Sequence, residues 1–430
     1  MLGIMTDYVC PRCRTTAPDT ALTWCCPRCR GPWDLAFAAA PVSLRSLASL
    51  PPRVNSLWRY AEALPLAEAQ PSTEAAPSAE AQPPAKAQPP AEALPPAEAL
   101  PSAEETTEAS GGTTRRADRS GPPPLSLGEG RTPLVPLTDT VSAKLDFLMP
   151  TLSFKDRGAV MLAELARRLG PRTVIADSSG NAGTAVAAYC ARAGLDCSVY
   201  VPEGTSPKKL EQIRAHGART VLVPGDREAT ARAARAAADE PGVFYASHVY
   251  NPHFLHGTKT YAYELWEELG GRLPDTLVLP VGNGTLLLGV ALAVEELYGH
   301  GLVDRRPVLV AVQAEAVAPL AAAFHAGAEE LPGPAEVRHT LAEGIAIPAP
   351  PRAAQILHAV RASGGTFRTV TEDQIRAAQL DLARRGLYVE PTGVACWAAV
   401  RAAPERPGTT VVPLCGAGAK TGLATESGEG

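Results

Sequence analysis

A single lysine, Lys155, stands between an aromatic residue and an acid–base pair within residues 153–158. It follows Pro150 and Thr151, and the amphipathic run over residues 160–169 after it predicts a helix. The positive end of a helix dipole disfavours a protonated amine, so the free base becomes accessible at a helix start. The position therefore suits Schiff-base chemistry, although such a charged run in isolation is usually a solvated helix start.

Two loops of small residues follow apolar runs and have the composition of anion-binding sites. The first consists of Gly282, Asn283, Gly284 and Thr285, and the second of Ser178, Ser179, Gly180 and Asn181. Glycines allow a ligand to approach the backbone closely, and the helix that follows supplies N–H donors and a positive dipole. We expect the first loop to hold a phosphate and the second a carboxylate, although glycines often serve only to make turns.

Four cysteines near the N-terminus form two Cys-x2-Cys pairs, Cys10 with Cys13 and Cys26 with Cys29. Each pair places two thiolates on one tight turn, and two such turns make a tetrahedral cage for a structural zinc ion. Disulfides or unpaired thiols are the alternative, which a cytosolic location disfavours. Cys25 adjoins the second pair and could compete for the metal. The arginines beside these cysteines are expected to solvate the turns rather than to contact nucleic acid.

The chain has 430 residues, which is enough for two or three domains with a large core. Its formal net charge of −5 at pH 7 gives no reason to expect nucleic acid or an anionic membrane as a partner. No apolar run reaches the ~20 residues of a membrane-spanning helix, and the N-terminus lacks the regions of a signal peptide. We expect a cytoplasmic protein with reduced thiols.

Shifts in composition divide the chain into four parts. Residues 1–37 form the expected zinc ribbon, and residues 38–66 form a helical segment that packs on the core. Residues 67–121 repeat proline, alanine and glutamate. Because proline breaks helices and few of these side chains are large enough to bury, this insert is expected to be disordered. Residues 122–425 form the catalytic core, in which a small subdomain over residues 172–255 is inserted into a large one.

Apolar strands and amphipathic helices alternate along the core. The expected strands cover residues 174–177, 197–201, 220–223, 243–246, 276–281, 308–313 and 411–414, the last of which leads into a small-residue loop at Cys415. The expected helices cover residues 184–193, 208–216, 227–238, 259–269 and 285–298. Such alternation is typical of α/β proteins with open, twisted parallel sheets, whose catalytic loops lie at the carboxyl ends of the strands.

In this order, the motifs resemble those of threonine synthase and, more broadly, of the pyridoxal 5'-phosphate (PLP) enzymes of the tryptophan synthase β fold type, or fold type II. The likeness covers nearly the whole chain except the proline-rich insert. Besides the loops and cysteines, it includes residues 57–60, 128–134, 153–158, 251–253, 257–260 and 390–391. The resemblance implies two parallel-sheet subdomains, a PLP cofactor and a small amino-acid substrate.

The resemblance also implies roles for individual residues. Lys155 would bind the cofactor covalently and later move protons at Cα and Cβ of the substrate. Phe154 would line the ring pocket, and residues 282–285 would hold the cofactor phosphate. Residues 178–181 would bind the substrate carboxylate and, through Asn181, the 3-hydroxyl of the cofactor.

Several positions depart from the threonine synthase pattern near the substrate phosphate. Phe254 stands where an arginine is usual, and Leu286 and Ala182 replace an asparagine and a threonine. A charged leaving group without these partners would lose hydrogen bonds of ~1.5–3 kcal/mol each. We therefore expect O-phospho-L-homoserine to be a poor substrate, unless His256 or Lys259 supplies the missing contacts.

Cys415 lies where the family has Ser or Thr facing the pyridine nitrogen, and in this it resembles some serine dehydratases of the same fold. The sequence thus favours a threonine synthase-like PLP lyase that performs elimination or replacement on a small L-amino acid. An L-serine or L-threonine ammonia-lyase is the first alternative. A catalytically inactive zinc-ribbon binding protein is an alternative of another class. We expect a homodimer with a small-molecule substrate and with neither nucleic acid nor membrane as a partner.

Overall fold

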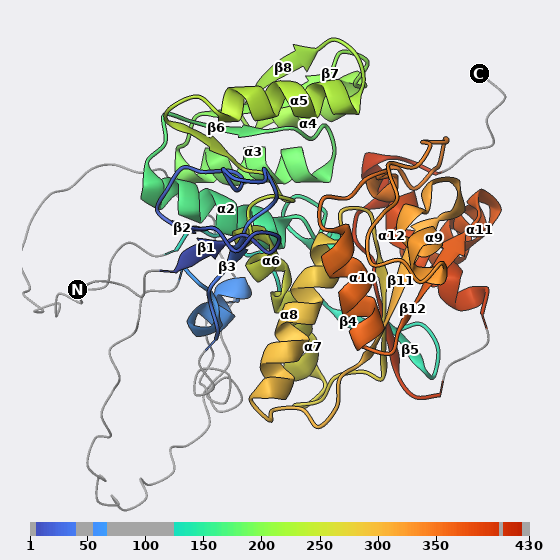
Figure 1. Cartoon of the computed structure of the whole chain (residues 1–430). Helices are drawn as coiled ribbons and strands as arrows, with labels where there is room; N and C mark the ends of the chain where they lie inside the picture. The colour runs from blue at the N-terminus through green and yellow to red at the C-terminus, as the bar shows by residue number, and fades with distance from the viewer. Residues whose placement is uncertain (1–5, 40–54, 67–123, 404–406, 424–430) are drawn as a thin grey trace, which may run out of the picture. The chain divides into compact units, whose positions relative to one another are not determined.

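The computed structural model describes residues 6–39, 55–66, 124–403 and 407–423 (Figure 1). All of these described residues belong to one compact unit. The predicted disordered insert over residues 67–121 lies outside the described residues, and so does the part of the predicted helical segment over residues 40–54. No helix in the described ranges is long and apolar enough to span a membrane.

Six strands form the larger sheet, in the order β12-β11-β10-β13-β5-β4. Their bounds are β4 (Leu134–Pro136), β5 (Val141–Lys144), β10 (Thr276–Pro280), β11 (Val308–Ala314), β12 (Thr366–Val370) and β13 (Thr410–Pro413). Five strands run parallel, as the alternating pattern predicts, whereas β4 pairs antiparallel with β5 at the edge. Residues 137–140, which join these two strands, are too few for the crossover that a parallel pair requires.

Four parallel strands form the smaller sheet, in the order β8-β7-β6-β9. Their bounds are β6 (Thr173–Ala176), β7 (Cys197–Pro202), β8 (Arg219–Val223) and β9 (Val243–Tyr245). The crossovers are α3 (Asn181–Ala193), α4 (Pro207–Ala215) and α5 (Arg227–Ala238). This sheet and its helices form the green part at the top of Figure 1.

The remaining helices precede, follow or cross between strands of the larger sheet. They are α2 (Asp156–Leu169), α6 (His253–Thr258), α7 (Thr260–Glu268), α8 (Thr285–Gly299), α9 (Pro319–His325), α10 (Ala353–Ala362), α11 (Glu372–Arg384) and α12 (Pro391–Arg401). Helix α2 begins directly after Lys155 and therefore earlier than the amphipathic run over residues 160–169 predicts. No strand or helix was predicted for residues 314–410, where the structure has β12 and α9 to α12.

The short helix expected around Trp58 forms as the 3-10 helix η1 (Leu57–Ala63). The Ser56 side chain accepts a hydrogen bond from Trp58 N at 3.2 Å and so caps its first turn. Trp58 and Tyr60 are buried, and the Trp58 indole donates to Leu125 O at 2.6 Å. These contacts hold η1 against the start of the catalytic core.

Helix α2 is buried along most of its length, from Asp156 to Ala166. Its apolar side chains pack with β6, α3 and η1 in one hydrophobic cluster. Two glycines allow α6 to approach it closely: a Cβ on Gly158 would lie 2.3 Å from Phe254 Cδ2, and a Cβ on Gly257 would lie 2.0 Å from Arg157 O. The close contact fixes the depth at which the start of α2 sits in the protein.

The N-terminal segment forms a small antiparallel sheet in the order β2-β1-β3, from β1 (Asp7–Val9), β2 (Thr16–Pro18) and β3 (Asp34–Leu35). The rings of Tyr8 and Trp33 stack on it with centroids 5.7 Å apart. The buried guanidinium of Arg352 joins this sheet to the core, because it donates both to Trp33 O and to Val249 O. The same guanidinium donates to Asp34 Oδ1 at 2.6 Å.

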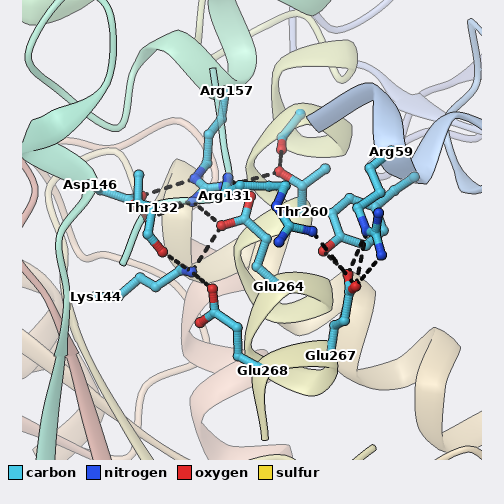
Figure 2. A network of polar contacts seen from close by, with 12 residues as sticks. Arg59, Arg131, Thr132, Lys144, Asp146, Arg157, Thr260, Glu264, Glu267 and Glu268 are labelled. Carbon is cyan, nitrogen blue, oxygen red and sulfur yellow. Dashed lines mark hydrogen bonds and ion pairs between the residues drawn. The ribbon is translucent and has the colours of Figure 1, made fainter. Parts of the chain in front are cut away.

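A buried network of ions holds Arg157, the second residue of α2, from two sides (Figure 2). Asp146 accepts from Arg157 Nε at 2.9 Å and from Nη2 at 2.8 Å. Glu264 on α7 accepts from Nη1 at 2.6 Å and from Nη2 at 2.9 Å. All three side chains are at most 1% exposed. The planar guanidinium therefore makes two bidentate contacts, which restrict its position and its orientation.

Lys144 on β5 extends this network to the larger sheet. Its ammonium group lies 3.0 Å from Glu264 Oε2 and 2.8 Å from Glu268 Oε1. It also donates to Thr132 O at 2.5 Å, and the Thr132 hydroxyl donates to Asp146 at 2.7 Å. The network thus connects β5, α2 and α7. The Lys144 side chain in it is fully shielded from water, and the Glu264 side chain is 1% exposed.

Replacing Glu264 by Gln should lower the free energy of unfolding by about 3–5 kcal/mol, because the buried charges of Arg157 and Lys144 lose the carboxylate they share. Urea unfolding at pH 7 measures this change. Glu228→Gln is the control, since it breaks the pair of Glu228 with Arg235, in which the Glu228 side chain is 62% exposed. The control should cost far less, because water screens exposed ion pairs. An equal loss in both variants would contradict the structural role of the network.

Wild-type protein and Glu264→Gln also test the charge state of Glu264. Burial raises the pKa of Glu264, but Arg157 and Lys144 lower it further, so that it stands at about 2. Such a carboxyl stabilises the folded state above its ordinary pKa of 4.5 and loses that contribution as the pH falls toward 2. The stability difference between wild type and Glu264→Gln should therefore narrow as the pH is lowered from 4.5 to about 3. A constant difference would show that Glu264 is not ionised in the network.

Candidate active site

Loops from both parallel sheets meet at one cavity of about 690 Å³. Asp177 follows β6, His248 follows β9 by a short loop, Gly282 follows β10, and Cys415 follows β13, and all four residues line the cavity. Each of them lies at the carboxyl end of a parallel strand, which is where ligands of open α/β sheets bind. Lys155 lines the same cavity and brings an amine to these loops.

A second cavity of about 680 Å³ lies farther along α8. Its walls are mostly apolar and come from residues 34–37, α6, α8 and α10. Its charged pair, Glu295 and Arg306, is joined at 2.7 Å, and no lysine or cysteine is among its lining residues in the described ranges. The residues that could perform amine chemistry are therefore those of the first cavity.

Lys155 ends the loop before α2, and its backbone forms the N-cap position of that helix. Its Nζ lies 4.7 Å from the ring centroid of Phe154 and 5.5 Å from that of Phe254. Burial lowers the pKa of Lys155 to about 7, the charge of Arg227 lowers it further, and the charge of Glu390 opposes both effects. The amine is therefore substantially unprotonated near neutral pH, which a nucleophilic lysine requires.

The predicted phosphate cradle is the turn between β10 and α8. Gly284 is the N-cap of α8 with φ +72°, a left-handed conformation that favours glycine, and no side chain caps the helix. A Cβ on Gly284 would lie 2.3 Å from Ile356 Cδ1, and one on Gly282 would lie 2.9 Å from Ile345 Cα. The first N–H groups of α8 thus have no side-chain cap. They lie beside the cavity, because Thr285, the first residue of α8, lines it.

The predicted carboxylate loop lies at the start of α3, and all four of its residues line the cavity. Gly180 is the N-cap without a side-chain hydrogen bond, so that this helix start is also open to an anion. The Asn181 side chain is held from two sides, because its Nδ2 donates to Glu390 at 3.1 Å and its Oδ1 accepts from Lys420 Nζ at 2.8 Å. These contacts join the smaller sheet to the C-terminal part of the chain.

Cys415 is a buried residue of the cavity lining, next to the loop that carries Lys155. Its carbonyl oxygen accepts a hydrogen bond from Phe154 N at 2.9 Å. Burial raises the pKa of the Cys415 thiol well above its usual value, so the thiol stays neutral at physiological pH. Phe154, Cys415 and Lys155, which were predicted to line the cofactor ring, face its nitrogen and supply the amine, therefore lie next to one another.

The sequence did not predict several titratable residues of the cavity, among them His248, Glu390 and Lys420. Burial, together with Lys155 and Arg227, lowers the pKa of His248 well below its usual value, and its Nε2 lies 3.5 Å from Asn283 Nδ2. Glu390 belongs to the Glu-Pro motif noted in the sequence, which marked the position without giving its contact. Lys420 carried no local signal, because its partner Asn181 is distant along the chain.

The three departures from the threonine synthase pattern have different positions. Leu286 and Ala182 line the cavity, whereas Phe254 is not among its lining residues in the described part of the chain. The Phe254 side chain is fully buried and packs against Gly158 and His248. Lys259, which was considered as a compensating cation, is instead paired with Glu296 at 2.9 Å. His256 lines the second cavity.

The four predicted metal ligands, Cys10, Cys13, Cys26 and Cys29, come together with all sulfurs within 4.8 Å of one another. The pairs Cys10–Cys29, Cys13–Cys26 and Cys13–Cys29 have sulfur separations of 3.4, 3.5 and 3.8 Å. A tetrahedral zinc site with Zn–S bonds of ~2.3 Å requires sulfurs ~3.8 Å apart, so the thiols have suitable spacing. Cys25 is outside this group.

Comparison with known proteins gives the family. The family model described as "Pyridoxal-phosphate dependent enzyme" matches residues 125–416, which is more than half of the chain. The chain belongs to this family. A threonine synthase of Methanosarcina acetivorans is 34% identical over 288 residues, which are 65% of this chain and 71% of that protein. A threonine synthase of Mycobacterium tuberculosis is 34% identical over 312 residues, which are 69% and 84% of the two chains.

Solved structures agree with this assignment of a PLP-dependent enzyme. A threonine deaminase of T.th. origin superposes with a TM-score of 0.56 at 29% identity, over 66% of this chain and 92% of that chain. A maize serine racemase has a TM-score of 0.57 over 67% and 88% of the two chains, and at 19% identity it shows the shared fold alone. The resemblance and the parallel-sheet architecture predicted from the sequence are confirmed.

Proposed function

We propose that this PLP-dependent enzyme is a carbon–oxygen lyase that catalyses elimination or replacement on a small L-amino acid. The observation that carries the proposal is Lys155, a partly buried amine of lowered pKa that shares one cavity with two uncapped helix starts. Threonine synthases among the relatives and a threonine deaminase among the similar structures support this class of chemistry. A catalytically inactive binding protein is less favoured, because it would not require a lysine of lowered pKa beside two anion-binding helix starts.

The residues around the cavity fit the chemical groups of PLP. We assign the phosphate to residues 282–285, where α8 offers unpaired N–H groups and its positive dipole end. Lys155 would hold the aldehyde carbon, Phe154 would line the ring, and Cys415 would face the ring nitrogen. Asn181, whose amide is fixed by Glu390 and Lys420, would contact the 3-hydroxyl.

When bound, the cofactor supplies an electron sink for negative charge at the substrate Cα. The chain orients the substrate through residues 178–181, since the open start of α3 provides N–H donors for the α-carboxylate. Lys155 would remove the proton from Cα, and its ammonium form would return that proton to the leaving oxygen as the C–O bond at Cβ breaks. An amine with a pKa of about 7 is suited to both tasks, because its two protonation states are comparably populated near neutral pH.

The neutral thiol of Cys415 would direct the outcome of the reaction. A partner without charge leaves the ring nitrogen unprotonated, which moderates the electron sink and suits elimination over transamination. Because the Cys415 pKa is raised by burial, the thiol has no tendency to ionise in the cavity.

An L-serine or L-threonine ammonia-lyase is the second candidate. It is favoured by Cys415, which resembles the serine dehydratases in this position, and by the 29% identity to the T.th. threonine deaminase. Both candidates eliminate a group from the side chain, and they differ in whether the amino group is retained in the product. A homodimer and a cytoplasmic location stay predictions from the sequence.

We also propose that Cys10, Cys13, Cys26 and Cys29 hold one structural zinc ion. Four thiolates would close the tetrahedral shell and leave no open position for a substrate. The two turns have the same geometry, which supports this proposal. Arg14 and Arg30 follow the two Cys-x2-Cys pairs, and each has a positive φ and donates its N–H to the carbonyl oxygen of the first cysteine of its pair.

A panel of neutral, dicarboxylic and phosphorylated L-amino acids tests the proposed function. The PLP-loaded protein should release a side-chain group, scored as phosphate, or ammonia together with a 2-keto acid. Release of ammonia and keto acid from L-serine or L-threonine identifies the ammonia-lyase, whereas a product that retains the amino group identifies replacement. If the loaded protein turns over no amino acid of the panel, the proposed function is wrong.

Borohydride reduction of the PLP-loaded protein should attach the cofactor to Lys155, and Lys155→Ala should lose the absorbance band of the lysine-bound cofactor. Labelling of Lys155 is expected because its amine lines the same cavity as residues 178–181 and 282–285, the two proposed anion sites. Peptide mapping by mass spectrometry identifies the labelled residue. Lys420 is the internal comparison, because it is a second lysine of the same cavity. Label on Lys420, Lys144 or Lys259 would contradict the assignment.

Metal analysis of protein purified without chelator should give about one zinc per chain, as expected for four thiolate ligands. Cys26→Ser should lose the metal and destabilise the N-terminal sheet, because a three-sulfur site is incomplete. Cys25→Ser is the matched control, since this buried neighbour lies outside the thiol group and should leave the zinc content unchanged. Wild-type protein without zinc and with four freely titratable thiols would refute the site.

A further inference from the structure

The guanidinium of Arg352, at the N-cap of α10, lies where three segments of the chain meet. Its side chain has no exposed surface. Five acceptors surround its five N–H groups: Nε donates to Val249 O at 2.8 Å, Nη1 to Asp34 Oδ1 at 2.6 Å and to Gln355 Oε1 at 2.9 Å, and Nη2 to Trp33 O and, at 3.5 Å, to Tyr250 O. Because these donors belong to one rigid planar group, the contacts restrict both the position and the orientation of the side chain.

The acceptors come from the N-terminal sheet, from the loop after β9 and from α10 itself. Asp34 belongs to β3 and follows Trp33, whose N–H donates to Tyr250 O at 3.1 Å. The Gln355 side chain adds a second link between α10 and β3, because its Nε2 donates to Asp34 Oδ2 at 2.8 Å. Arg352 therefore joins three segments that are far apart in the sequence.

The loop after β9 connects Arg352 with the active-site cavity. Val249 accepts from Arg352, and the preceding residue, His248, lines the cavity. His248 Nε2 lies 3.5 Å from Nδ2 of Asn283, which belongs to the loop over residues 282–285 that is assigned to the cofactor phosphate. A shift of the backbone at Val249 would therefore move the His248 ring relative to the phosphate loop.

Helix α10 contacts the same phosphate loop directly. Ile356, four residues after Arg352, is fully buried, and a Cβ on Gly284 would lie 2.3 Å from Ile356 Cδ1. Gly284 is the N-cap of α8, so the position of α10 limits the conformation of the loop at the start of α8. The guanidinium thus acts on the phosphate loop in two ways, through His248 and through Ile356.

The burial of a charge at this place is not explained by stability alone. Removal of a guanidinium from water is costly, and among the described residues its one ion-pair partner is Asp34, whose side chain is 35% exposed. An apolar side chain could fill the same space without that cost. What the arginine provides is a single arrangement of the three segments in which all of its donors are used. Such an arrangement is expected where the joined segments shape a ligand site.

We infer that Arg352 is a positioning residue for the cofactor phosphate, which fixes α10 and the loop after β9 against residues 282–285 and makes the N-terminal sheet part of cofactor binding. The inference rests on the proposed function, in which residues 282–285 hold that phosphate. Arg352 is not among the described residues that line the cavity. It therefore acts through Ile356 and His248 and not by contact with the cofactor.

The test compares the affinities of the full-length protein for PLP and for pyridoxal, which lacks the phosphate. Both are titrated by the absorbance band of the lysine-bound form, and the ratio of their dissociation constants measures phosphate binding. Arg352→Lys keeps a positive charge beside Asp34 but cannot supply the planar fork of five donors. It should reduce the preference for PLP about 10- to 100-fold, as for one lost hydrogen bond to a charged group, and leave the pyridoxal affinity nearly unchanged.

Arg361→Lys is the matched control. Arg361 lies in the last turn of the same helix, and its Nη2 also donates to backbone carbonyls, Ala328 O at 2.7 Å and Phe324 O at 3.5 Å. The control should keep the full preference for PLP. An unchanged preference in Arg352→Lys, or an equal loss in Arg352→Lys and Arg361→Lys, overturns the inference. Equal weakening of PLP and pyridoxal in Arg352→Lys overturns it as well, because a purely structural role would act on both.

If Arg352→Lys does not fold, as judged by circular dichroism, Asp34→Asn decides. This variant leaves Arg352 and its carbonyl acceptors in place but removes the charge of its carboxylate partner, which is partly exposed. The preference for PLP should then fall about 2- to 10-fold, as for a weakened hydrogen bond. In that case, an unchanged preference overturns the inference.

Gly284→Ala separates the failure of the inference from the failure of the proposed phosphate site. Its methyl group would meet Ile356, so this variant should also lose the preference for PLP. If Gly284→Ala loses the preference and Arg352→Lys keeps it, the inference alone is wrong. If both keep it, the phosphate is bound elsewhere and both proposals are wrong. Because the readout is binding, a protein that turns over no amino acid would refute the proposed lyase activity and leave this comparison intact.

Discussion

The double bidentate contact of Arg157 with Asp146 and Glu264 is the constraint on which the active site depends (Figure 2). Removal of such ions from water costs several kcal/mol for each, so a buried network adds little net stability compared with apolar packing. What it provides is a single allowed geometry, since any displacement leaves a charge without its partner. Because Arg157 is two residues after Lys155, this geometry fixes the direction in which the reactive amine leaves the start of α2.

Neighbouring contacts restrain Lys155 from its other side. Phe154 N donates to Cys415 O at 2.9 Å, and the Asp156 carboxylate accepts from Thr151 N at 2.7 Å. The loop before the helix is therefore held by the strand end at β13, while the helix itself is held by α6 and α7. An amine whose backbone is fixed on both sides loses little entropy when it meets a ligand, which is the general requirement for a precise catalytic group.

The sequence predicted those parts of the site that are local along the chain. Lys155 and the glycine loops could be found because each lies within a few residues of a strand end or helix start, and the alternation of strands and helices gave the fold class. The antiparallel β4 was not predicted, and neither was the role of Glu390 and Lys420 around Asn181, because their contacts join residues more than 200 positions apart. Phe254 was expected near the substrate phosphate from its place in a motif, and its ring is not among the described lining residues but packs against Gly158, 5.5 Å from Lys155 Nζ.

Two of the helices that begin at the cavity have a glycine at the N-cap. Helices α3 and α8 begin with Gly180 and Gly284, and no side chain caps either of them. Helix α5 begins at the same cavity with Asp226 as its cap, and α11, away from the cavity lining, carries a full capping box at Thr371. Most other described α-helices also lack a side-chain cap, so what marks α3 and α8 is that their uncapped N–H groups begin at the cavity, where an external anion can reach them. At α5 the Asp226 carboxylate takes the place that such an anion would have, because it accepts from the Ala229 N–H.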